Sequence, residues 1–134
     1  MSNTYLAQIH GLGQEIDGLV KDILRLLDSC AAGEAVSFDI RLCLEEALIN
    51  AVKHGNKNNK NLPIKVSYCI SGGKFMASVE DSGNGFDYKK IPDPTTKENL
   101  LNTSGRGVYL IRRLMDEVSF NKSGSKITMV KYLK

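Results

Sequence analysis

The sequence lacks two features that would direct it to a membrane or out of the cell. No apolar run is long enough to cross a bilayer, and no basic region followed by an apolar run marks a signal peptide. We therefore expect a cytoplasmic protein without a membrane partner. The three cysteines, Cys30, Cys43 and Cys69, show no CxxC spacing. This favours small buried thiols in a reducing compartment over a disulfide framework.

A basic stripe is also missing. The 134 residues include 18 Lys and Arg against 15 Asp and Glu, and the two signs are interspersed along the chain. Nucleic-acid binders concentrate Lys and Arg on one patch, so we expect no nucleic-acid partner. The length suits one domain and is short for two, so residues 1–134 are expected to form a single domain.

Several common site patterns are absent as well. The sequence has no Gly-Lys-Ser/Thr of a P-loop and no G-x-S-x-G elbow. His10 and His54 lack metal-ligand spacing with each other or with a cysteine. An EF-hand that began at Asp81 would need Glu at its twelfth position, where the chain has Pro92. These absences argue against a hydrolytic triad, a zinc site and a calcium loop.

Apolar periodicity predicts two helices after a short strand over residues 5–9. The first runs from Gln14 to about Ala32, with Gly33 as its stop. The second begins at Ser37 as N-cap, runs to about His54 and ends at Gly55. The following run, residues 56–61, is too polar to bury and is predicted to be an exposed loop.

The second half of the chain is predicted to be mostly strands. Residues 64–70 and 74–80 form a hairpin, residues 108–115 a helix, and residues 118–121 and 126–133 a further strand pair. The glycine- and proline-rich stretch 81–107 is too long for an ordinary connection and is typical of a lid or binding loop. The element order predicts an α+β sandwich with helices on one face of a mostly antiparallel sheet.

Glu46 and Asn50 stand one helical turn apart, away from the centre of the apolar face of their helix. The Asn50 oxygen can coordinate Mg²⁺, and the Glu46 carboxylate can accept a proton. A solvated helix face explains the same spacing.

Two glycine-rich loops flank the long connection. In Asp81-Ser82-Gly83-Asn84-Gly85-Phe86, which follows a strand, glycines let the backbone approach a ligand and Asp81 can accept a hydrogen bond from an exocyclic amine. A plain Asn-Gly turn is the alternative. Ser104-Gly105-Arg106-Gly107-Val108 opens a helix, where free N–H groups and the Arg106 guanidinium suit phosphate.

Taken together, these segments resemble the GHKL ATPases, the group that includes gyrase and the histidine kinases. Residues 46–56 are similar to the N-box of that group and residues 81–86 to its G1 box. Residues 105–118 resemble the G2 box of the bacterial anti-sigma factor serine kinases, and residues 92–95 and 98–101 resemble the lid of that branch.

The resemblance implies a Bergerat-type two-layer fold that uses ATP and Mg²⁺. It implies that Glu46 is the catalytic base, that Asn50 binds Mg²⁺, and that residues 87–104 form the lid. The ATP-binding residues that it implies are Asn50, Lys53, Asp81, Gly83, Gly85, Phe86, Ser104, Gly105, Arg106, Gly107 and Val108.

The implied function is a serine/threonine protein kinase of the anti-sigma factor type. Its substrate would be an anti-anti-sigma protein of the STAS type, and the same surface would sequester a sigma factor. The resemblance leaves open whether the chain forms a homodimer. The alternative is a non-catalytic ATP-binding module that regulates a partner by nucleotide-dependent binding. The Glu46 carboxylate favours the kinase, because binding alone needs no base.

Overall fold

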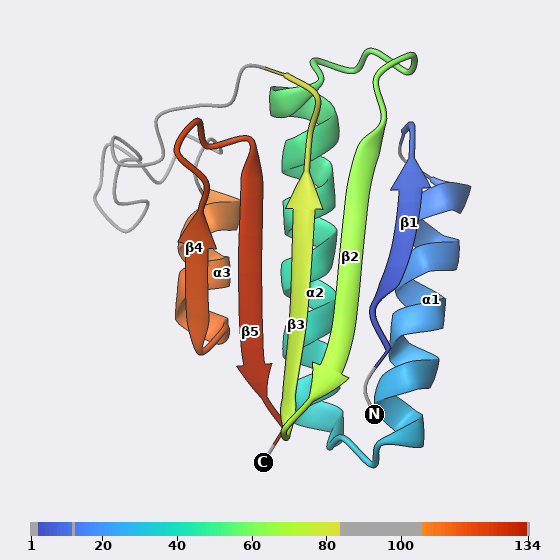
Figure 1. Cartoon of the computed structure of the whole chain (residues 1–134), viewed down its shortest axis with the longest axis vertical. Coiled ribbons are helices and arrows are strands. Elements are labelled where there is room, and N and C mark those ends of the chain that lie inside the picture. Colours follow the sequence, from blue (N-terminus) through green and yellow to red (C-terminus); the bar gives the residue numbers. More distant parts are fainter. Residues whose placement is uncertain (1–2, 12, 84–105, 134) are drawn as a thin grey trace.

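The computed structural model describes residues 3–11, 13–83 and 106–133, which form two layers (Figure 1). One layer is an antiparallel sheet with the strand order β1-β2-β3-β5-β4. The helices lie together on one face of this sheet. The predicted α+β sandwich, with its mostly antiparallel sheet, is therefore confirmed in the described part of the chain.

The predicted order of elements is also confirmed. The strands are β1 (Tyr5–Ile9), β2 (Ile64–Ser71), β3 (Lys74–Glu80), β4 (Glu117–Phe120) and β5 (Lys126–Tyr132). The helices are α1 (Gln14–Ser29), α2 (Glu34–Asn50) with its π-helical continuation η1 (Ala51–Gly55), and α3 (Arg106–Leu114). None of the described helices is long and apolar enough to pass through a bilayer.

The core lies between the three described helices and the sheet. Alternate residues of β3, namely Phe75, Ala77 and Val79, are buried on the side that faces the helices. Leu44 and Leu48 of α2 pack into the same core. Each fully buried large apolar side chain stabilises the fold by roughly 1.5–3 kcal/mol. This packing holds the end of α2 beside the end of β3.

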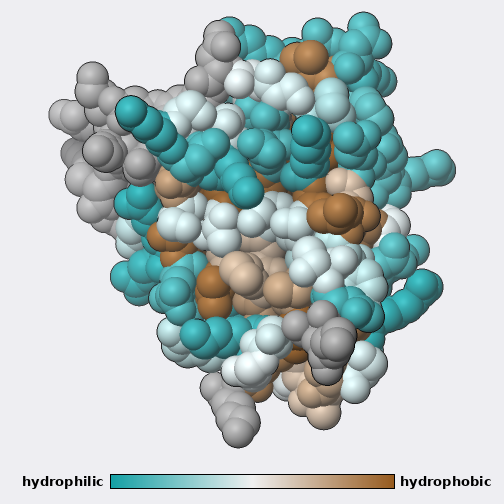
Figure 2. Space-filling model, in the orientation of Figure 1, coloured by the Kyte–Doolittle hydropathy of each residue, from teal (hydrophilic) through white to brown (hydrophobic). Residues whose placement is uncertain are grey.

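The opposite face of the sheet is not covered by any described helix (Figure 2). In that view an apolar central area is bordered by hydrophilic side chains. Leu6, Met76 and Tyr132 are exposed large hydrophobic residues of this face. The face also holds a shallow hollow of about 480 Å³ that Leu6, Lys65 and Ser78 help to line.

The prediction that Ser37 caps the second helix is wrong. α2 begins at Glu34, and Gly33 is its N-cap with extended backbone (φ −68°, ψ 158°). The Ser37 N–H donates to the Gly33 carbonyl at 2.9 Å, so Ser37 already belongs to the helix. Its hydroxyl is buried and has no hydrogen-bond partner among the described residues. Serine is a preferred N-cap residue, but glycine is also accepted at the N-cap, so residue type alone does not show which of the two caps the helix.

The first helix ends earlier than predicted, at Ser29. Ala31 has a φ of 56°, and the Ala32 N–H donates to the Leu27 carbonyl at 3.1 Å. This left-handed residue closes the helix as glycine commonly does. Gly33 therefore starts α2 instead of stopping α1.

The predicted end of the second helix at Gly55 is confirmed, but its last turn is wider than an α-helix. The Asn56 N–H donates to the carbonyl of Ala51, five residues earlier, at 2.8 Å. Such π turns are rare and are often found at functional sites. The prediction that residues 56–61 are exposed fails at Asn56, which is buried.

Candidate functional site

Three chain segments meet at one end of the sandwich: the end of α2 with η1, the loop after β3, and the start of α3. Glycines mark the points where they touch. A Cβ added at Gly55 would overlap the Asp81 carboxylate, and a Cβ added at Gly83 would overlap the Gly55 carbonyl. Only glycine permits backbones to approach this closely. The first two segments are therefore fitted together around Asp81.

Asp81 lies half-buried at the end of β3 and is fixed from two sides. Its N–H donates to the Ser125 carbonyl at 2.9 Å, and its Oδ1 accepts the Gly83 N–H at 2.8 Å. Burial raises the pKa of the Asp81 carboxyl above its ordinary value, the Gly83 hydrogen bond opposes this, and Glu80 adds to it. A fixed, partly dehydrated carboxylate is suited to accept a hydrogen bond from a ligand.

The third segment approaches α2 at Gly107. A Cβ at Gly107 would lie 2.8 Å from Glu46 Oε2 and 2.9 Å from Asn50 Nδ2. The two side chains thus stand next to each other against the first turn of α3, as their spacing predicts. Among the described residues neither side chain makes a hydrogen bond or an ion pair.

A small cavity of about 40 Å³ lies between these segments. The residues that line it include Asn50, Gly55 and Asp81 from the first two segments and Val108 from α3. Polar groups from α2 and β3 therefore converge on one apolar-walled space. Small-molecule sites combine apolar walls with a few polar groups in this way, but their usual volume is about 300–1,000 Å³, so a cavity of this size does not hold a nucleotide by itself.

Some of the predicted residues fall elsewhere. Lys53 is exposed on η1 and is not among the residues that line the cavity. Gly85, Phe86, Ser104 and Gly105 lie outside the described residues, as does the proposed lid. Arg106 begins the α3 backbone, and its side chain is not described.

Residue-based reasoning missed several members of this site. His54 and Gly55 line the cavity, and Asn56 and Ser82 join its two sides by a hydrogen bond. Residue spacing identifies Gly55 only as the end of a helix, because a glycine that ends a helix and a glycine that makes room for a carboxylate look alike in a sequence. Apart from its place at the end of the segment that resembles the N-box, nothing marks Asn56, because it opens a run of polar residues that are otherwise exposed.

Comparison with known proteins shows the family of the chain. Residues 15–131 match the model of the histidine kinase-like ATPase domain. The serine-protein kinases RsbW of Staphylococcus aureus strains MSSA476 and MW2 are each 38% identical to the chain over 104 residues. The match covers 72% of this chain and 65% of the length of those relatives.

The fold is similar to that in the crystal structure of the RsbU and RsbW domains of Rv1364c from Mycobacterium tuberculosis. The TM-score is 0.67 at 18% identity, and the match covers 98% of this chain and 32% of that chain. At this identity the likeness concerns the fold. The family model, in contrast, spans most of the chain and includes every described segment of the site. The chain therefore belongs to the family of histidine kinase-like ATPase domains, for which ATP is the substrate.

Proposed function

We propose that residues 1–134 act as one ATP-binding domain that phosphorylates serine or threonine of an anti-anti-sigma protein of the STAS type. The observation that carries the proposal is the placement of Glu46 beside Asn50 against Gly107. Similarity to the serine-protein kinases RsbW supports it. The proposal extends to a sigma factor that the same chain sequesters.

The residues present fit ATP. The Asp81 carboxylate would accept a hydrogen bond from the adenine amine, and Gly83 would let the base lie close to the backbone. The free N–H groups at the start of α3, with Gly107 and Val108, would receive the phosphates. Gly55 has no side chain, and this leaves room for the Asp81 carboxylate; a Cβ at position 55 would overlap that carboxylate.

Magnesium fits the same place. The Asn50 carbonyl oxygen is a hard ligand, and Mg²⁺ is usually held by one or two protein oxygens together with phosphates and water. When bound, the ion would neutralise charge on the transferred phosphoryl group.

The chemistry left to the protein is proton transfer and orientation. The substrate hydroxyl oxygen forms a bond to the γ-phosphorus while the bond from that phosphorus to the bridging oxygen breaks, and ADP leaves. The Glu46 carboxylate takes the hydroxyl proton. Glu46 is a suitable base because, among the described side chains, no cation forms a salt bridge with its carboxylate.

The test is a single-turnover reaction with γ-labelled ATP, Mg²⁺ and a candidate STAS-type protein. We expect label on a serine or threonine of that protein and loss of labelling when Mg²⁺ is chelated. Tight binding of both ATP and the STAS-type protein without any labelling would contradict the kinase and leave a module that regulates by nucleotide-dependent binding.

A further inference from the structure

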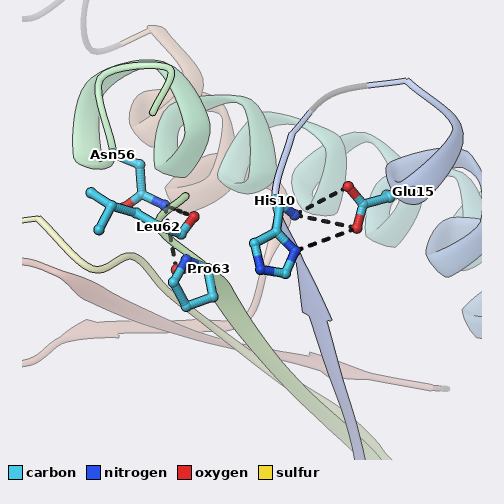
Figure 3. A network of polar contacts seen from close by, with 5 residues as sticks. All are labelled: His10, Glu15, Asn56, Leu62 and Pro63. Atoms are coloured by element: carbon cyan, nitrogen blue, oxygen red, sulfur yellow. Dashed lines mark hydrogen bonds and ion pairs between the residues drawn. The ribbon is translucent and has the colours of Figure 1, made fainter. Parts of the chain in front are cut away.

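Asn56 is the one buried polar residue in the described ranges, with 4% of its surface exposed. Its Nδ2 donates to the Leu62 carbonyl at 2.9 Å and to the Pro63 carbonyl at 3.3 Å (Figure 3). Its Oδ1 accepts the Ser82 N–H at 2.7 Å. Both ends of the amide are therefore used, as a buried polar group requires.

The chemistry of this position is specific to asparagine. The side chain must offer donors toward two carbonyls and an acceptor toward an N–H on its other side. Aspartate would turn an oxygen toward both carbonyls, and alanine would leave all three backbone groups without this partner. Asn56 is therefore more than a filler of space.

The group that Asn56 holds is the loop of the site. Ser82 stands between Asp81 and Gly83, and its hydroxyl donates to the Pro63 carbonyl at 2.7 Å. Gly55, which precedes Asn56, lets this loop approach η1. The side chain of Asn56 thus fixes how far the Asp81 loop stands from the end of the helix that carries Glu46 and Asn50.

We propose that Asn56 is the positioning residue for Asp81 and, through it, sets the preference for ATP over GTP. This inference rests on the proposed function, in which the Asp81 carboxylate accepts the adenine amine. Guanine carries a carbonyl oxygen at that point, which a carboxylate repels. The discrimination depends on a hydrogen bond of about 2.7–3.2 Å, and it weakens if the loop moves away.

The experiment measures the affinities of ATP and GTP by calorimetry for wild type and Asn56→Ala. We expect the ratio of ATP affinity to GTP affinity to fall about tenfold in the variant. Asn59→Ala is the matched control. Asn59 lies in the same loop and is exposed, and its side chain accepts the Asn61 N–H at 3.0 Å and makes no described hydrogen bond to residues 81–83. It should leave the ratio unchanged.

A double variant separates positioning from general stability. If Asn56 acts through Asp81, adding Asn56→Ala to Asp81→Asn should not change the ATP-to-GTP ratio further. Asn56→Ser, which keeps a hydroxyl in the same space, replaces Asn56→Ala in both measurements if the alanine variant does not fold.

An Asn56 variant that is less stable but keeps the wild-type ratio would overturn the inference and leave the proposed function intact. The same conclusion would follow if the variant lost affinity for ATP and GTP equally, or if its effect added to that of Asp81→Asn. A wild-type protein that binds ATP no better than GTP would instead contradict the proposed role of Asp81, and the inference with it.

Discussion

The two ends of the long second helix handle polar groups in opposite ways. Near its start, Asp39 pairs with Lys131 Nζ at 3.5 Å, and the same ammonium donates to the Leu114 carbonyl at the end of α3 at 2.6 Å. The two side chains are only 27% and 15% exposed. Near its other end, Glu46 and Asn50 lie against Gly107 and make no ion pair or hydrogen bond with another described residue.

The first end is closed to chemistry. Burial is the main cause that raises the pKa of the nearby Cys43 thiol to about 12; Asp39 and Glu46 act in the same direction and Lys131 opposes them, so the thiol stays protonated. The second end places the Asn50 amide and the Asp81 carboxylate on the lining of one cavity, with the Glu46 carboxylate and Asn50 together against Gly107. The comparison suggests that one end stabilises the packing of α2 against α3 and the sheet, while the other keeps polar groups free for a ligand.

The largest effect should come from the open end. Glu46→Gln should slow phosphoryl transfer by about 10²–10⁴-fold, the usual contribution of a general base. ATP affinity should change little, because the carboxylate need not touch the nucleotide before transfer. Single-turnover labelling measures the first quantity and calorimetry the second.

Glu45→Gln is the matched control for that variant. Glu45 is the neighbouring residue and pairs with Arg41 at 3.0 Å on another side of the helix. Its loss should leave transfer unchanged. Equal rates for Glu46→Gln and wild type would show that Glu46 is not the base.

The next effect should arise where the two sides of the site touch. Gly83→Ala would drive a Cβ into the Gly55 carbonyl, a backbone group that cannot rotate away. We expect a loss of about 1–3 kcal/mol of unfolding free energy, the usual cost of overpacking, together with weaker ATP binding. Denaturant unfolding and calorimetry measure the two quantities.

Gly18→Ala provides the opposite case. Gly18 lies in the middle of α1 and an added Cβ meets nothing within 4 Å. Alanine should raise stability by about 0.5–1 kcal/mol there, because glycine is a poor helix former. If Gly83→Ala and Gly18→Ala changed the free energy of unfolding in the same direction, Gly83 would not be needed for the close approach of the two backbones.

The closed end should respond in stability alone. Lys131→Met removes the partner of Asp39 and of the Leu114 carbonyl while keeping an apolar stem of similar length. We expect a loss of about 1–3 kcal/mol of unfolding free energy with ATP affinity unchanged. Lys65→Met, on the exposed opposite face of the sheet, should be close to neutral. A large fall in ATP affinity for Lys131→Met would break the division between the two ends.

Much of the fold and part of the site could be predicted from the sequence. Strand alternation and helical periodicity report burial, so the order of elements, the sheet and the pairing of Glu46 with Asn50 followed from spacing. Helix boundaries did not. Ala31 takes a left-handed conformation that its residue type does not announce. Ser37 has the chemistry of a cap but lies inside the helix.

Contacts between distant segments were also beyond spacing. The hydrogen bond between Asn56 and Ser82 joins residues 26 positions apart, and the ion pair of Lys131 with Asp39 spans most of the chain. Each depends on how the helix layer docks on the sheet. The polar run that begins at Asn56 predicted exposure correctly for Lys57 and Asn58, and nothing in its composition distinguished the one member that turns inward.

The smallest effect should be a dependence of stability on pH that comes from Asp81. Its pKa in the folded protein lies above the ordinary value of 3.8, mainly because burial disfavours the charged form. The folded protein therefore holds this proton more tightly than the unfolded chain does. Below the ordinary value both states are protonated and no penalty exists. As the pH rises through the folded pKa, the carboxylate ionises in its half-buried place and stability is lost.

Asp81→Asn removes the ionisation and keeps an oxygen for the Gly83 N–H, so the nucleotide-free variant should gain stability relative to wild type as the pH rises from 3 toward neutrality. Thermal unfolding of both proteins across that range measures the difference. A difference in unfolding temperature that stays constant with pH would mean that burial does not disfavour the charged form of Asp81. The two ends of α2 would then differ only in whether their polar side chains have partners.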